Sequence, residues 1–236
     1  MHKVLPLALI LGLSWGQASA VVIEDNYWGS NNRGYGDVIS APGDSSYQIH
    51  NMEVTFSGGF MNVIVNTNFT GPDKYGVDFG DLFISTNGWN PYGSAADNYK
   101  YDNYSNGEGW EFVFDTSASM LYGGDFSINL SDDMMGAGYV FRNGQEVQRR
   151  DGGTAYAGSS VDLSNAGNGG YIEYNILLSS LGITDGTDIG LKWGMTCAND
   201  TIEGVVTASV PEPTSLLLLS IGLLGLGAVT RRKRSS

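Results

Sequence analysis

Two stretches that combine aromatic and amide side chains offer the surfaces best suited to bind a sugar. The first covers residues 26–35 and includes Trp28, and the second covers residues 87–104 and includes Trp89 and Tyr92. Aromatic rings can stack against the C–H faces of sugar rings, while Asn and Asp side chains bind the hydroxyls. Both stretches contain residues typical of loops, where binding sites commonly lie. Trp28, Trp89 and Tyr92 are therefore candidate glycan-binding residues, and packing within the loops is the alternative.

Acidic residues in further loops suggest calcium as a second kind of ligand. Ca²⁺ takes six to eight oxygen ligands from carboxylates, amides and backbone carbonyls. Asp73, Asp78 and Asp81 lie in a glycine-flanked loop and are the candidate metal ligands. Two other acidic groups are Asp97 with Asp102 and Asn103, and Asp132 with Asp133. None of these groups follows the EF-hand pattern, so chance clustering of the acidic residues is the alternative. Ca²⁺ is the only cofactor that the sequence suggests.

Catalytic chemistry has few residues to use. His50 is the only histidine outside the N-terminal segment and Cys197 is the only cysteine. A zinc site of several His and Cys ligands therefore lacks its ligands, and no disulfide can form within the chain. A glycosidase needs two carboxylates about 5–9.5 Å apart. Glu108 and Glu111 belong to no recognisable motif, and Glu173 is expected to face solvent or a concave sheet surface, so we expect no enzymatic activity.

The charge of the chain limits its partners. The 236 residues have a formal net charge of −13, and residues 21–210 contain seven basic and 24 acidic residues, a charge of about −17. A nucleic-acid-binding surface needs a basic patch that this balance does not supply. Such a charge keeps a protein soluble, repels polyanions and attracts cations.

The candidate residues must be positioned by β-strands, because alternation of apolar and polar residues is the main periodic signal. Trp110 and Trp193 lie in alternating segments and are predicted to be core residues. The predicted strands, about ten in all, cover residues 52–56, 61–69, 82–84, 110–114, 126–130, 139–141, 146–148, 172–176, 189–195 and 202–207.

Turn signals complete the prediction of the fold. Gly58-Gly59 and Asn143-Gly144 are typical of two-residue hairpin turns. A single helical turn is expected at residues 177–181, ended by Gly182. Many short strands without long helices favour an all-β, jelly-roll-like two-sheet sandwich over a barrel. One such domain would cover residues 21–209.

A short segment late in this domain resembles a known kind of sandwich. Residues 173–182, followed by Gly186 and a strand from Ile189, are similar to the late part of DOMON-like and carbohydrate-binding β-sandwiches. In those proteins a strand enters a one-turn helix before the final strands, and Leu177 stands where they usually have proline. The resemblance implies the fold more than any ligand.

The N-terminus has the pattern of a secretory signal peptide at residues 1–20. Lys3 supplies the positive start, residues 4–13 form a short apolar run, and Ala18-Ser19-Ala20 is a small-residue cleavage site. Signal peptidase would release a mature chain that starts at Val21. A membrane anchor is the alternative, but the run is short for one.

Residues 210–236 have three parts in a fixed order. A Pro-Glu-Pro motif is followed by an apolar run at residues 216–229 that contains three glycines, and then by a basic cluster. The apolar run, taken as a helix, would span roughly 21 Å of a bilayer core of about 30 Å. The basic cluster would stay on the cytoplasmic side. The motif is Pro211, Glu212 and Pro213, and the cluster is Arg231, Arg232, Lys233 and Arg234.

This arrangement resembles the PEP-CTERM sorting signal of Gram-negative bacteria. The resemblance implies that the chain pauses in the inner membrane, that an exosortase recognises it, and that the tail is removed near Pro211-Glu212-Pro213. It also implies a place at the cell surface or in the biofilm matrix, with exopolysaccharide as a neighbour. A plain C-terminal membrane anchor is the alternative.

These observations together predict an exported, non-catalytic surface or matrix protein. A carbohydrate-binding or calcium-dependent adhesive module is the alternative, and a glycan-processing enzyme is a less favoured one. A groove of Trp and Tyr without facing carboxylates would favour the module, and two convergent carboxylates in it would favour the enzyme.

Overall fold

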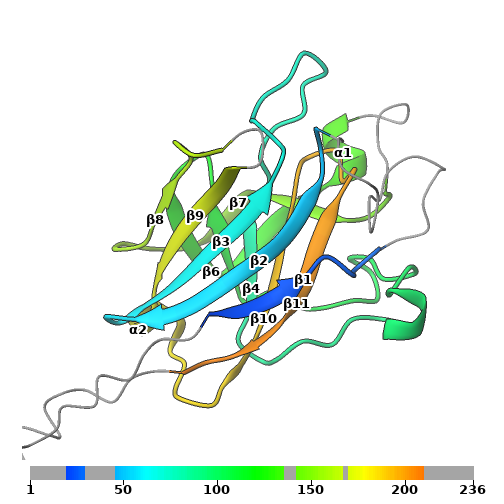
Figure 1. Ribbon diagram of the computed structural model, residues 1–236. Coiled ribbons are helices and arrows are strands. Elements are labelled where there is room, and N and C mark those ends of the chain that lie inside the picture. Colours follow the sequence, from blue (N-terminus) through cyan, green and yellow to red (C-terminus); the bar gives the residue numbers. More distant parts are fainter. Residues whose placement is uncertain (1–19, 30–45, 136–141, 167–169, 210–236) are drawn as a thin grey trace, which may run out of the picture.

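The domain between the two ends folds into two antiparallel β-sheets, as the computed structural model of the chain shows (Figure 1). The structure describes residues 20–29, 46–135, 142–166 and 170–209. The predicted signal peptide, the Pro211-Glu212-Pro213 motif, the apolar run and the basic cluster lie outside these residues. Within the described residues, no helix is long and apolar enough to cross a membrane.

One sheet has five strands in the order β1-β2-β3-β9-β8, and the other has six in the order β11-β10-β4-β5-β6-β7. The predicted all-β two-sheet sandwich is confirmed. The elements are β1 (Val21–Glu24), β2 (Ile49–Ser57), β3 (Phe60–Thr67), β4 (Leu82–Ser85), a 3₁₀ turn (Ala95–Asp97), β5 (Phe112–Asp115), β6 (Met120–Leu130), α1 (Ser131–Met135), β7 (Glu146–Tyr156), β8 (Ser160–Asp162), β9 (Gly170–Leu177), α2 (Leu178–Leu181), β10 (Asp188–Gly194) and β11 (Thr201–Thr207).

The hairpin between β2 and β3 forms where the glycine pair predicts it. Gly58 and Gly59 have φ angles of +59° and +86°, and Ser57 pairs with Phe60 across the turn. A turn with two positive φ angles matches the twist of the flanking strands, and glycine adopts those angles without strain. The expected helical turn is also present as α2, with Gly182 left-handed at its C-terminal end.

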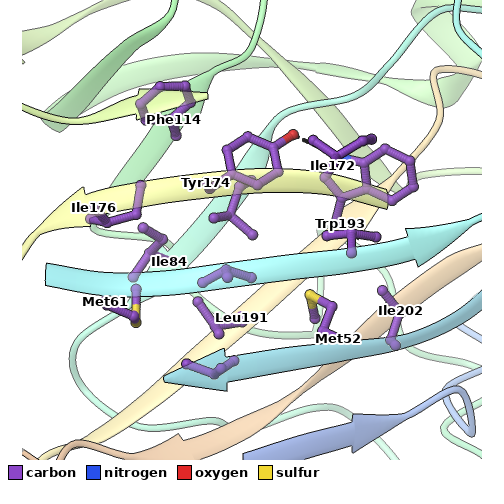
Figure 2. Close-up of a cluster of buried hydrophobic side chains, with 14 of the residues drawn as sticks. Met52, Met61, Ile84, Phe114, Ile172, Tyr174, Ile176, Leu191, Trp193 and Ile202 are labelled. Carbon is purple, nitrogen blue, oxygen red and sulfur yellow. Dashed lines mark hydrogen bonds between the residues drawn. The ribbon is translucent and has the colours of Figure 1, made fainter. Parts of the chain in front are cut away.

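The core lies between the two sheets and uses the alternating side chains of both. Figure 2 shows β3 and β9 residues packed against Ile84, Leu191 and Trp193 of the six-stranded sheet. The indole N–H of Trp193 donates to the hydroxyl of Tyr174 at 2.9 Å, which joins the sheets through a buried polar contact. Trp193 is fully buried, so its predicted core position is confirmed.

Several local predictions are wrong. Trp110 precedes β5 and is half-buried outside the core cluster, against Phe83 with ring centroids 5.9 Å apart. Asp132 and Asp133 begin the short helix α1 rather than a loop. The strands β1 and β8, of four and three residues, were not predicted, because neither segment shows a regular alternation of apolar and polar residues. Asn143 and Gly144 do form a turn, but the expected strand at residues 139–141 lies outside the described residues.

Candidate functional site

A long loop between β4 and β5, residues 86–111, covers the outer face of the six-stranded sheet. Two carboxylates hold the start of this loop. Glu111 accepts hydrogen bonds from the backbone N–H of Thr86 at 2.8 Å and from the side chain of Asn87 at 2.7 Å. Glu108 accepts from the hydroxyl of Ser85 at 3.2 Å and from the backbone N–H of Asn90. Both glutamates therefore bind the loop itself and fix its course over the sheet.

The loop buries a row of side chains that alternation alone would place in solvent. Across the sheet, Glu203 of β11 is paired with Lys192 of β10, and Lys192 is paired with Phe83 of β4. These residues belong to the face opposite Leu191 and Trp193, because successive side chains of a strand point to opposite sides. Lys192 and Glu203 are nevertheless only 1% exposed. The outer face thus contains a second, polar interior.

Lys192 is at the centre of this interior. Its Nζ lies 2.6 Å from Oε2 of Glu146 and 3.3 Å from Oε2 of Glu203, and it donates to Oε1 of Gln145 at 2.7 Å. Such a buried charge costs free energy unless it is paired and hydrogen-bonded. The amide lies just before β7, one carboxylate lies at the start of β7, and the other carboxylate comes from β11.

Two tryptophans of the β4–β5 loop complete the network. The indole N–H of Trp89 donates to Oε1 of Glu203 at 2.8 Å. The indole N–H of Trp110 donates to Oε1 of Glu146 at 3.3 Å. Each glutamate therefore has one oxygen toward Lys192 and one toward a tryptophan. The loop is fastened to the sheet by these buried bonds.

Tyr27 and Asp102 form the far end of the network. The fully buried hydroxyl of Tyr27 donates to Oδ2 of Asp102 at 2.8 Å. The other oxygen of Asp102 accepts from the backbone N–H of Tyr92 at 3.0 Å, and the backbone carbonyl of Asp102 accepts from Gln145 at 2.9 Å. The segment after β1 is thereby tied to the β4–β5 loop.

The ionisation of the network follows from its burial and its excess of acids. The pKa of Glu203 is raised to about 7, chiefly by burial and also by repulsion from Asp102 and Glu146, while attraction by Lys192 opposes the shift. Burial also raises the pKa of Asp102. Burial disfavours the charge of Lys192, but attraction by Glu146 and Glu203 outweighs it and raises its pKa. Lys192 is therefore charged at neutral pH, and Glu203 is partly protonated there.

A cleft of about 300 Å³ opens where this network reaches the surface. It lies along β1 and β11, which run side by side at the edges of the two sheets (Figure 1). A Cβ on Gly204 would meet Cγ2 of Ile23 at 2.6 Å, so glycine permits the close approach of β1 to β11. The polar and aromatic side chains of the lining are Glu24, Asn26, Trp89, Asn98, Tyr99 and Glu203.

Two aromatic rings shape one side of the cleft. Trp89 and Tyr99 meet edge to face, with centroids 5.1 Å apart, and Tyr99 stacks on Tyr27 at 6.1 Å. The exposed side chains of Val22 and Val205 add apolar surface to the lining. The cleft therefore combines an aromatic pair and small apolar side chains with amides and carboxylates, a lining that suits a ligand with both apolar and hydroxyl faces.

The structure separates the three residues predicted to bind sugar. Trp89 lines the cleft, whereas Tyr92 and Trp28 do not. Tyr92 is 53% exposed elsewhere on the loop. Trp28 is half-buried, and its backbone N–H donates to the carbonyl of Asn98 at 2.7 Å.

Sequence reasoning missed Tyr99 and Glu203 as cleft residues. Tyr99 belongs to the aromatic loop, but nothing in its local sequence distinguishes it from neighbouring tyrosines. Glu203 stands at a polar position of a predicted strand. The opposite charge of Lys192 in the preceding predicted strand was the one signal that could have indicated a partner for Glu203.

The three predicted calcium ligands have separate partners. Asp73 accepts from the hydroxyl of Tyr47 at 2.5 Å and from the backbone N–H groups of Tyr75 and Val77. Asp78 accepts from the backbone N–H of Phe79 at 2.7 Å.

Asp81 is buried, and its two oxygens accept from the backbone N–H groups of Thr116 and Arg149 at 2.8 and 2.7 Å. Burial raises its pKa to about 7. In the part of the chain that the structure describes, no three His, Cys, Asp or Glu side chains are grouped to hold a metal ion. The carboxylates of Asp73, Asp78 and Asp81 thus each accept hydrogen bonds from separate donors, and their role as calcium ligands stays a prediction.

Comparison with known proteins places one part of the chain. Residues 209–233 match the PEP-CTERM protein-sorting motif. The chain carries a PEP-CTERM sorting signal. This match supports an exported protein that is targeted to exosortase through a membrane-anchored step. It covers the Pro-Glu-Pro motif, the apolar run and the start of the basic cluster. No curated protein and no solved structure matches the chain, so the resemblance of residues 173–182 to DOMON-like sandwiches stays a prediction.

Proposed function

We propose that this chain is an exported, exosortase-processed surface protein whose β-sandwich binds carbohydrate without modifying it. Signal peptidase would remove residues 1–20, and exosortase would act on the PEP-CTERM signal. The sandwich would then stand at the cell surface or in the extracellular matrix of a Gram-negative bacterium. Exopolysaccharide is the partner that this location makes available.

The observation that carries the proposal is the cleft beside Trp89 and Tyr99. The rings of Trp89 and Tyr99 offer apolar surface to a sugar ring, and the amides of Asn26 and Asn98 offer both donors and acceptors for hydroxyls. Its position on the edge of a rigid sandwich leaves the lining in place before a ligand arrives. A preformed site avoids part of the entropy cost of binding.

The partners of the nearby carboxylates favour binding over catalysis. A glycosidase acid and its partner must both reach the scissile bond. Glu108 and Glu111 are occupied by loop backbone and side-chain donors. Glu146 and Glu203 are directed to Lys192 and to indole N–H groups inside the protein.

An adhesive or purely structural role without a ligand is the second candidate. Two observations favour it. The nearby carboxylates are engaged with partners inside the protein, and the high negative charge of the domain keeps an exported protein soluble. The cleft distinguishes the two roles, because a structural part has no need of an open aromatic lining.

The direct test is a glycan array probed with the mature protein purified after export. Tyr99→Ala removes one ring of the cleft, and Tyr101→Ala removes an exposed ring of the same loop that lies outside the cleft lining. We expect Tyr99→Ala to weaken binding about tenfold, equivalent to ~1.4 kcal/mol, while Tyr101→Ala binds normally. Equal weakening by both variants, or no glycan bound by the unaltered protein, would contradict the proposal.

A further inference from the structure

Both charged side chains in the lining of the cleft are acidic. Glu24 projects from the exposed edge strand β1, and Glu203 comes from β11 at the inner side. The described residues that line the cleft include no lysine, arginine or histidine. A ligand in this cleft therefore meets a negative potential.

The interior behind the cleft adds to this potential. Lys192 is within coulombic reach of Glu146, Glu203 and Asp102, so one buried base faces three acids. Burial together with Asp102 and Glu146 holds the pKa of Glu203 at about 7, and Lys192 only partly offsets the shift. A positive charge brought to the cleft would favour the ionised form of Glu203 and would be attracted to it in turn.

We propose that the cleft selects sugars that bear a free amino group over the same sugars in N-acetylated form. This inference rests on the proposed carbohydrate-binding function and names the class of ligand. The sugar ring would lie against Trp89 and Tyr99, with its ammonium group beside the exposed carboxylate of Glu24 and within the electrostatic field of the buried Glu203. Ammonium groups donate up to three hydrogen bonds and have no acceptor, which suits carboxylate partners.

The charge of the whole domain acts in the same direction. Residues 21–210 have a formal charge of about −17, and such a field concentrates cations near the surface. Sugars with carboxylate groups would instead be repelled. The long-range field alone, however, would attract any cation to any face, so the test must separate the cleft from the general charge.

The experiment compares two short ligands, the tetramer of glucosamine and the tetramer of N-acetylglucosamine, by isothermal titration of the mature protein. The measurements are made at pH 6, where the amines of the glucosamine tetramer are largely charged, and at 0.15 M salt, where distant charges are screened. Glu24→Gln removes the exposed carboxylate and keeps its shape. Asp125→Asn removes an exposed charge from β6, which β10, β4 and β5 separate from β11, and serves as the matched control.

We expect the glucosamine tetramer to bind about tenfold more tightly than its acetylated form. Glu24→Gln should reduce its affinity about threefold, as for one partly exposed ion pair, and leave the acetylated ligand unaffected. Asp125→Asn should change neither affinity.

Two results would overturn the inference while leaving carbohydrate binding intact. One is equal affinity of the two tetramers with both still weakened by Tyr99→Ala. The other is equal loss of glucosamine binding in Glu24→Gln and Asp125→Asn, which would assign the preference to net charge. Absence of binding by both tetramers and by every array glycan would overturn the proposed function as well.

Discussion

The indole N–H of Trp89 donates to Oε1 of Glu203 at 2.8 Å, across 114 residues of sequence. This bond joins the aromatic side of the surface cleft to the buried ion pairs around Lys192. It explains how a long loop with few apolar residues stays on the outer face of the sheet, because its contacts there are charge-assisted hydrogen bonds.

The first prediction concerns Lys192. Lys192→Met keeps an unbranched apolar side chain and removes the buried cation between Glu146 and Glu203. Because two buried carboxylates then lack their cation, the free energy of unfolding should fall by about 3–5 kcal/mol. Urea unfolding measures the loss, and Lys100→Met, which removes an exposed ion pair with Asp97, should cost less than about 1 kcal/mol. A loss of similar size in both variants would count against the network as a stabilising unit.

The second prediction concerns the pH dependence of stability. The pKa of Glu203 is about 7 in the folded state against an ordinary value of 4.5, so the folded protein binds more protons than the unfolded chain between these pH values. The free energy of unfolding should therefore fall as pH rises from 5 to 7, by up to about 1.4 kcal/mol per unit for one group. Asp81, with a pKa also raised to about 7, contributes in the same direction.

Glu203→Gln separates the two contributions. This variant should retain the parts of the slope due to Asp81 and Asp102 and lose the part due to Glu203, whatever its effect on stability at a single pH. Lys192 stays protonated in both states over this range and adds no slope. Urea midpoints at pH 5, 6 and 7 supply the measurement, and an unchanged slope in Glu203→Gln would contradict the assignment to Glu203.

The sequence predicted the inner face of the sandwich much better than its outer face. The alternation in β2 and β3 and the Gly58-Gly59 turn are local patterns, and local patterns are enough to predict a hairpin with one buried face. Lys192 and Glu203 occupy the polar positions of the same kind of pattern. Alternation assigns a side chain to a face but does not say whether another segment covers that face. The burial of both residues depends on where the loop at residues 86–111 lies, which is a tertiary property.

The candidate cleft was predictable only in part, for the same reason. Trp89 was identified because aromatic and amide residues cluster around it. Tyr92 and Trp28 have equally suitable surroundings in sequence, yet their side chains lie outside the cleft lining. The cleft forms where β1 meets β11, and a four-residue strand such as β1 has no periodic signal that would place it there.

The third prediction concerns the anchors of the long loop. Glu111→Ala removes the acceptor for the backbone N–H of Thr86 and for Asn87, so amide hydrogen exchange at residues 86–90 should accelerate by about tenfold, the equivalent of one net hydrogen bond. Glu173→Ala removes a partner of Asn62 on the other sheet and is the matched control. Equal exchange rates at residues 86–90 in Glu111→Ala and the unaltered protein would show that the loop is held by other contacts.

The fourth prediction concerns calcium. Asp73, Asp78 and Asp81 are engaged with separate hydrogen-bond donors, so we expect Ca²⁺ to bind these residues no better than Mg²⁺ does. The melting temperature should be the same in millimolar Ca²⁺ and in millimolar Mg²⁺. A gain specific to Ca²⁺ would contradict this prediction, because saturation at 100 times Kd adds about 2.7 kcal/mol. Loss of that gain in Asp73→Asn would then assign the ion to this loop.

The last prediction concerns the sorting signal. Residues 216–229 would span roughly 21 Å as a helix, less than a bilayer core of about 30 Å, and three glycines lower its helix stability further. We expect Pro211 and Pro213 to favour an extended chain just before this run, because proline fixes its own φ and disfavours helix in the residue before it. An extended segment at the membrane face is accessible to a processing enzyme.

Replacing Pro211-Glu212-Pro213 by three alanines should let the helix continue and leave the uncut chain in the inner membrane. Intact mass spectrometry of the surface protein should show the tail missing in the unaltered chain, and a C-terminus at Ser236 there would instead support a permanent anchor.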